Sequence, residues 1–153
     1  MLQFIFWLTV FFLIAGGWLV WSFVRRTLFS RRVERVLRDF VRDRDEIQAE
    51  FLKAAGASGK PRGLAWKQCD FQDGLRLARD RATGEIVGLV GTTISFAAIE
   101  GGGMEEVEAV GNLRAATAVL TWKYGRWTSQ GRAVFNLEPR EVLDRYRDHL
   151  DPI

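Results

Sequence analysis

The sequence predicts an α+β protein: a single N-terminal transmembrane helix, an amphipathic juxtamembrane helix, and a small antiparallel sheet, open or barrel-like, with a C-terminal packing helix. Three observations carry this prediction. Residues 2–24 contain no charged side chain. Residues 25–55 repeat apolar side chains at the spacing of an amphipathic helix. After a glycine-containing linker at 56–63, residues 64–153 change to the alternation typical of strands.

The uncharged run 2–24 is long enough to cross a membrane once. As a helix its 23 residues measure about 34 Å, at about 1.5 Å per residue, and a hydrocarbon core is roughly 30 Å thick. A cleaved signal peptide is the weaker alternative, because no basic segment precedes the run and no small-residue cleavage site ends it.

Basic residues crowd the far side of this run and predict its orientation. Six arginines and one glutamate lie between Arg25 and Arg38, and such residues favour the cytoplasmic side. We therefore expect the N-terminus outside and the C-terminal domain in the cytoplasm, at the inner or plasma membrane if the source is bacterial. The residues expected to set this topology and to contact anionic lipid headgroups are Arg25, Arg26, Arg31 and Arg32.

Five further residues are interface candidates. Gly16 and Gly17 form a small-residue patch that lets another helix approach closely. Trp18 and Trp21 suit the headgroup level of a membrane. Tyr124 occupies the tip of a predicted hairpin, where side chains are seldom buried.

The helix expected over 25–55 has an apolar stripe with three open interpretations. Its apolar positions include Phe29, Val33, Val36, Phe40, Ile47 and Phe51. The stripe covers the sheet domain, lies along the membrane surface, or pairs with another helix. The first of these is favoured, and Arg44 within the stripe argues against a coiled-coil seam.

The sheet domain is predicted to contain short strands at 64–71 and 75–80, a long strand at 85–99, and a further short one at 104–110. The clearest hairpin joins 113–122 to 127–137. If Tyr124 and Gly125 form a two-residue loop, Trp122 lies opposite Trp127. One face of this hairpin is apolar and the other is rich in threonine, as in an antiparallel sheet with one solvated side.

A C-terminal helix over 139–150 is expected to pack on this sheet. Pro139 suits the first helical position and Glu141 suits the third. Asp151 and Pro152 end the helix.

The distribution of charge and the numbers of cysteine and histidine argue against several kinds of partner and site. Residues 60–153 hold 13 basic and 13 acidic side chains, so the excess of positive charge lies at 25–59, beside the predicted membrane. This distribution argues against a nucleic-acid partner. A single cysteine and a single histidine exclude an internal disulfide and argue against a zinc site.

Three patterns carry weak signals of chemistry. Cys69 and His149 form the only possible thiol–imidazole pair, the acidic segment 100–108 offers carboxylates, and the glycines of 88–93 resemble a phosphate loop without its lysine. A core cysteine, a solvated loop and a strand explain these three patterns better than a catalytic pair, a metal site or a phosphate loop does. We therefore expect no catalytic residue, no metal site and no cofactor.

The expected function is that of a single-pass membrane-anchored, non-enzymatic protein whose cytoplasmic domain binds protein, as an accessory or assembly subunit of a larger membrane complex. The expected partners are membrane lipids and other subunits, with a homo-oligomer as a further option and no nucleic acid. The alternatives are a membrane-tethered module that senses a ligand or lipid, and a membrane-associated enzyme.

Overall fold

The computed structural model describes residues 2–58 and 63–153, without the side chains of residues 2–6, 8–15, 25–26 and 108–109. Part of the predicted linker 56–63 therefore lies outside the described residues. The chain divides into two units, Met1–Arg38 and Asp39–Ile153. Among the described residues, no helix combines the length and the apolar composition that crossing a membrane requires. The transmembrane helix predicted over 2–24 is thus unsupported by the described structure.

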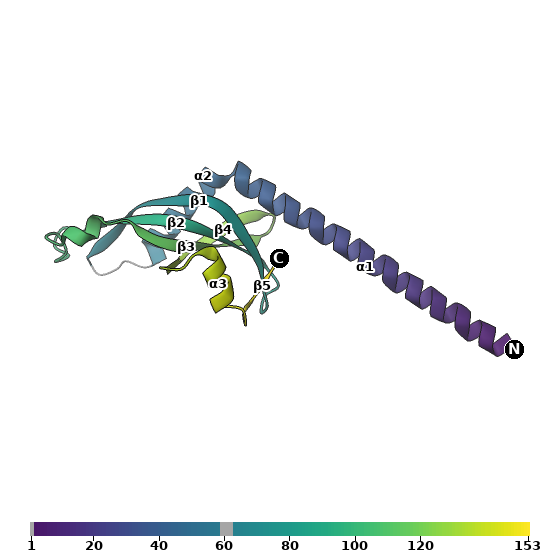
Figure 1. The fold of residues 1–153 in the computed structure, drawn as a ribbon. Helices are drawn as coiled ribbons and strands as arrows, with labels where there is room; N and C mark the ends of the chain where they lie inside the picture. Colours follow the sequence, from purple (N-terminus) through teal and green to yellow (C-terminus); the bar gives the residue numbers. More distant parts are fainter. Residues whose placement is uncertain (1, 59–62) are drawn as a thin grey trace. The chain divides into compact units, whose positions relative to one another are not determined.

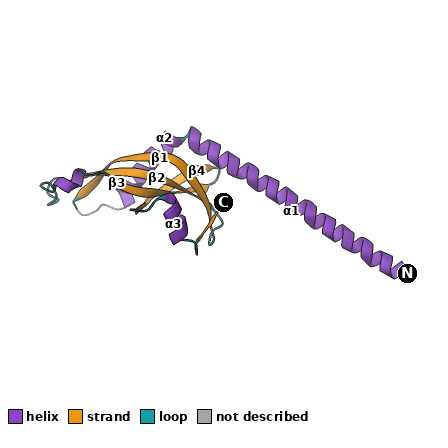
Figure 2. Cartoon of the chain, in the orientation of Figure 1, coloured by secondary structure: helices purple, strands orange, loops and turns teal. Residues whose placement is uncertain are grey.

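Two helices account for the N-terminal part of the chain (Figure 2). Helix α1 spans Leu2–Arg42 and helix α2 spans Arg44–Ser58. The predicted helix 25–55 is therefore divided at Asp43. Backbone hydrogen bonds continue across this residue, because the Asp43 N–H donates to the Asp39 carbonyl and the Ile47 N–H donates to the Asp43 carbonyl.

The predicted antiparallel sheet is confirmed, and it is curled (Figure 1). Its five strands stand in the order β4-β3-β2-β1-β5. They are β1 Leu64–Asp80, β2 Ile86–Ala98, β3 Arg114–Lys123, β4 Arg126–Phe135 and β5 Leu150–Pro152. Each strand pairs antiparallel with its neighbours.

The β3–β4 hairpin has the predicted register. Trp122 pairs with Trp127, and both loop residues have positive φ, 54° at Tyr124 and 79° at Gly125. Positive φ at both positions belongs to the turn whose twist matches that of the strands. The register then shifts between Ala118 and Leu120.

Three other predicted elements differ from the structure. The two strands expected at 64–71 and 75–80 form one continuous strand, whose pairing with β2 is irregular between Phe71 and Leu75. The expected strand 104–110 is a loop that contains the short 3₁₀ helix η1, Glu108–Gly111. The segment holds three glutamates and follows three glycines, and both residue types are depleted in strands.

The C-terminal helix is present but shorter than predicted. Helix α3 spans Pro139–Arg145, not 139–150. The last residues instead add a short strand to β1, where Asp151 pairs with Arg79 and the Ile153 N–H donates to the Leu77 carbonyl. Pairing with this edge satisfies backbone groups that a longer helix would leave without partners.

The inner face of the curled sheet packs against α2 and the end of α1. Ile47, Phe51 and Ala55 of α2 are buried there. An aromatic cluster fills the space between the helices and the sheet: Phe40, Phe51, Trp66, Phe71, Phe96, Trp122, Trp127 and Phe135. From Phe40 onward, the apolar stripe of the predicted helix 25–55 thus covers the sheet, the first of its three interpretations.

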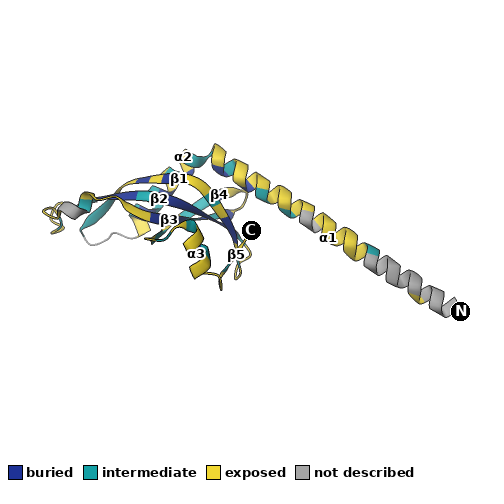
Figure 3. Ribbon diagram, viewed as in Figure 1, coloured by how far each residue is buried: buried dark blue, intermediate teal, exposed yellow. Residues whose placement is uncertain are grey.

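The second face of the sheet is also covered in part. Val142 of α3 packs with Val87 and Leu89 of β2 in a buried cluster. Because apolar side chains point to both sides of β2, this strand is buried along almost its whole length (Figure 3). The expectation that this second face is solvated is therefore wrong where α3 packs.

Candidate functional site

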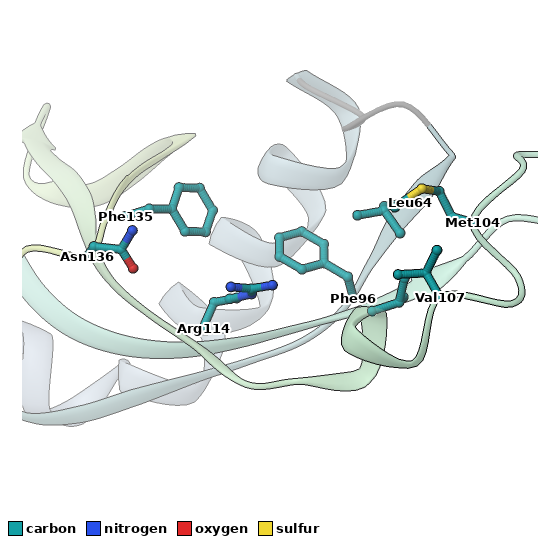
Figure 4. Close-up of a pocket in the computed structure, with 8 residues that line it drawn as sticks. Leu64, Phe96, Met104, Val107, Arg114, Phe135 and Asn136 are labelled. Atoms are coloured by element: carbon teal, nitrogen blue, oxygen red, sulfur yellow. The ribbon is translucent and has the colours of Figure 1, made fainter.

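A pocket of about 340 Å³ opens where the sheet meets the loop that joins β2 to β3 (Figure 4). We call it the Phe96 pocket. It is lined by Leu64, Phe96, Met104, Val107, Val110, Arg114, Phe135 and Asn136. These side chains come from β1, β2, the β2–β3 loop, β3 and the end of β4.

The aromatic wall of the Phe96 pocket is part of the core. The Phe96 ring lies 5.1 Å from the Trp66 ring and 6.3 Å from the Phe135 ring, measured between centroids. Phe96 is buried, whereas Phe135 is 41% exposed. Aromatic rings held by such contacts form a preformed surface, because few rotamers remain open to them.

Arg114 and Asn136 supply the polar groups of the pocket. Figure 4 shows the Arg114 side chain pointing toward Phe96, with the Phe135 ring on its other side. Arg114 is exposed and forms no ion pair with another described residue. Asn136 has a φ of 58°, which asparagine tolerates better than most residues, and its N–H donates to the Ala115 carbonyl.

The loop wall of the pocket is held by glycine contacts. A Cβ on Gly63 would lie 2.5 Å from the Gly102 carbonyl oxygen, so the two backbones meet where only glycine fits. The Gly102 N–H donates to the Glu105 carboxylate at 3.1 Å, and such backbone hydrogen bonds lower the pKa of Glu105. Glu105 of the acidic segment 100–108 thus stabilises its own loop.

No cluster of three or more metal-ligating side chains occurs among the described residues. The segment 88–93, whose two glycines resemble a phosphate loop, lies within β2. This agrees with its alternative interpretation as part of a strand. A Cβ on Gly88 would lie 2.6 Å from the Trp127 ring. Gly88 therefore makes room for an indole, which explains this glycine without a phosphate ligand.

Cys69 and His149 are not brought together. Cys69 lies near the Leu64 end of β1 and is buried, with its sulfur 3.0 Å from the Thr92 hydroxyl. Burial raises the pKa of the Cys69 thiol. His149 is exposed beside the other end of β1, where its carbonyl accepts the Arg81 N–H. This arrangement contains no thiolate–imidazole pair.

The sequence-predicted site residues belong to both units. In the first unit, Gly17, Trp18, Trp21, Arg31 and Arg32 are exposed on α1, and Gly16 is half-buried; the side chains of Arg25 and Arg26 lie outside the described residues. In the second unit, Tyr124 is 91% exposed at the hairpin tip.

Sequence reasoning did not identify the Phe96 pocket. Its walls are separated by up to 72 positions, from Leu64 to Asn136, and only the pairing of strands brings them together. One signal was present: Phe135 continues the apolar face of the hairpin to the last residue of β4.

In comparisons with known proteins, no family model, no curated protein and no solved structure matched this chain.

Proposed function

We propose that this chain is a membrane-anchored, non-enzymatic accessory protein whose folded domain binds a segment of a partner protein at the Phe96 pocket. One observation carries the proposal: exposed apolar side chains line a pocket with an arginine that forms no ion pair with another described residue. Val107 is 42% exposed and Phe135 is 41% exposed, and both line the pocket together with Arg114.

The composition of this surface resembles the centre of a protein interface. Aromatic residues, methionine and arginine are enriched in such centres, and lysine and glutamate are depleted. Phe96, Phe135, Met104 and Arg114 are of the enriched kinds. A partner that places an apolar side chain against Phe96 and a carboxylate beside Arg114 matches both the shape and the charge of the site.

The anchor is supported by the sequence and by the exposed part of α1. Residues 2–24 have no charged side chain. Trp18, Leu19, Val20 and Trp21 are successive residues, each more than 60% exposed, so they cover all sides of the helix. A helix that is apolar all round needs an apolar environment. The arginines at 25, 26, 31 and 32 then contact anionic headgroups on the cytoplasmic side.

The docking proposal is tested by gentle extraction of the full chain from its native cells, followed by mass spectrometry of the proteins that accompany it. Arg114→Glu and Val107→Asp, both in the pocket lining, are compared with Arg126→Glu, an exposed arginine outside the pocket. We expect one stoichiometric companion, lost from both pocket variants and retained by Arg126→Glu. A companion that survives both pocket variants, or a chain without any companion, contradicts the proposal.

The anchor has a separate test. The wild-type chain is expected to remain in the membrane pellet after washing with alkaline carbonate, and a Leu13→Arg, Leu19→Arg variant is expected to be released. Two reporters are fused to the C-terminus in turn. The reporter that works only in the cytoplasm is expected to be active, and the reporter that works only outside the cytoplasm is expected to be inactive. A wild-type chain that washes off contradicts the anchor and leaves the docking site to stand on its own test.

A further inference from the structure

A second pocket lies on the opposite face of the sheet, next to α3. Its volume is about 410 Å³, which is within the range of small-molecule sites and holds about a dozen non-hydrogen atoms at roughly 30 Å³ each. We call it the His149 pocket. It is lined by Asp80, Ala82, Val87, Leu89, Val119, Thr121, Arg132, Val134, Val142, Tyr146, His149 and Leu150.

The floor of the His149 pocket is the apolar cluster between the sheet and α3. Val87, Leu89 and Val142 are buried, and Val119 and Val134 are half-buried beside them. The two half-buried valines come from the neighbouring strands β3 and β4. A ligand in this pocket would therefore place an aliphatic group on a packed apolar surface, where removal from water stabilises binding.

The rim of the pocket carries hydrogen-bond donors on three different elements. Arg132 lies on β4, Tyr146 at the end of α3, and His149 in the turn before β5. Arg132 forms no ion pair with another described residue. An arginine guanidinium presents several N–H groups in one plane, which suits a carboxylate.

The one acidic residue of the rim is engaged in its own turn. The Asp80 carboxylate accepts the Ala82 N–H at 2.8 Å and the Thr83 N–H at 2.9 Å. Backbone hydrogen bonds, first that from Thr83, lower the pKa of Asp80. Asp80 therefore keeps its negative charge while it shapes the β1–β2 turn, and His149 is near enough to act on that charge. Arg132 is the one arginine of the pocket lining.

The rim is also tied together across the chain. The Arg81 N–H donates to the His149 carbonyl at 2.9 Å, and the His149 N–H donates to the Tyr146 carbonyl at 2.8 Å. The Arg81 guanidinium pairs with the Asp151 carboxylate. These contacts join the turn after β1 to the turn after α3, so both polar walls are held in place before a ligand arrives.

From this geometry we infer that the His149 pocket binds a small aliphatic carboxylate, with the chain on the valine and leucine floor and the carboxylate on Arg132. Tyr146 and His149 supply the further donors at the rim. This site is independent of the protein-docking surface at the Phe96 pocket, because the two pockets share no residue.

The test uses the full chain in lipid nanodiscs, with ¹³C-labelled valine and leucine methyl groups, titrated with hexanoate. Hexanamide is the matched neutral probe. Two variants are compared with wild type: Arg132→Gln, which removes the charge at the rim, and Arg126→Gln, which removes an exposed β4 arginine outside the pocket. Removal of a charge-assisted hydrogen bond is expected to weaken hexanoate binding about tenfold or more.

The expected result is saturable shifts of the Val119, Val134 and Leu150 methyl groups. Hexanoate should bind wild type and Arg126→Gln equally, and Arg132→Gln and hexanamide should each weaken binding. Three results would overturn the inference: no saturation up to millimolar concentrations, shifts confined to Val107 and Leu64 of the Phe96 pocket, or equal binding by Arg132→Gln. The methyl spectrum of Arg132→Gln without ligand shows whether that variant is folded.

Discussion

Gly131 of β4 lies directly against the backbone of Ala55 in α2. Its φ is +70°, and a Cβ at this position would overlap the Ala54–Ala55 peptide. The strand is bulged here, and the bulge lets the helix approach to backbone contact. The close approach of α2 to β4 at this point therefore requires a residue without a side chain.

Replacing Gly131 by alanine is expected to destabilise the domain by about 3 kcal/mol, through a strained φ and a clash with a backbone that cannot rotate away. Urea unfolding followed by tryptophan fluorescence measures this loss. Gly84→Ala is the matched control, because Gly84 has a φ of +72° with open space around it and should lose only about 1 kcal/mol. Equal losses in the two variants would show that close packing on α2 is unimportant.

The edge of β1 is closed by side chains of α2, and this contact can be removed. The Phe71 N–H donates to Gln48 Oε1 at 2.8 Å, and the Arg44 guanidinium donates to the Phe71 carbonyl. Gln48→Ala leaves a part-buried N–H without a partner, which is expected to cost about 1–2 kcal/mol and to speed hydrogen exchange at the Phe71 amide. Gln68→Ala, which loses only a bond to the Asp70 side chain, should leave that amide protected. Unchanged exchange in Gln48→Ala would contradict the contact.

Cys69 is expected to be unreactive in the folded chain. Its thiol is buried and its pKa is raised by burial, so both access and the thiolate form are restricted. Alkylation at pH 8, followed by intact mass, should be at least about a hundredfold slower in buffer than in urea. Because the pKa is raised above the ordinary value of 9.0, the protonated thiol stabilises the fold at pH values below 9.0. This contribution to the free energy of unfolding declines as the pH rises above 9.0. Rapid alkylation without denaturant would show that the strand opens readily.

Asp80 is expected to make the domain sensitive to acid. Its pKa is lowered by backbone hydrogen bonds in the turn, so the ionised carboxylate stabilises the fold above the ordinary value of 3.8. That contribution is lost as the pH falls through the lowered pKa. Asp80→Asn keeps an oxygen acceptor and removes the charge, so thermal unfolding of the variant and wild type should differ at pH 6 and converge toward pH 3. A difference that does not change with pH would contradict the role of the charge.

The hairpin illustrates what could be predicted. Trp122 and Trp127 flank a two-residue turn at Tyr124 and Gly125, and such a turn sets the register of both strands by local geometry alone. Alternation of apolar and polar residues then indicates which face is buried. Local sequence therefore predicted the pairing of Trp122 with Trp127 next to the turn, but not the register shift between Ala118 and Leu120.

The candidate pockets illustrate what could not be predicted. Phe96 and Arg114 line one pocket because the β2–β3 loop returns the chain to the same end of the sheet. Val87 and Arg132 line the other because two antiparallel pairings, β2 with β3 and β3 with β4, bring them to one face. A periodic pattern within one segment carries no information on which distant segments will lie next to it.

By itself the sequence determined the character of the segments: an uncharged N-terminal run, an amphipathic helix, an antiparallel sheet and a helix begun by Pro139. These depend on spacing and on side chains within a few residues of each other. Only the tertiary structure decided that the last residues pair with β1 instead of extending α3, and that α2 closes the edge of that strand. Both outcomes depend on the N–H and C=O groups at the edge of β1, which need hydrogen-bond partners. Segments far away in the sequence supply these partners.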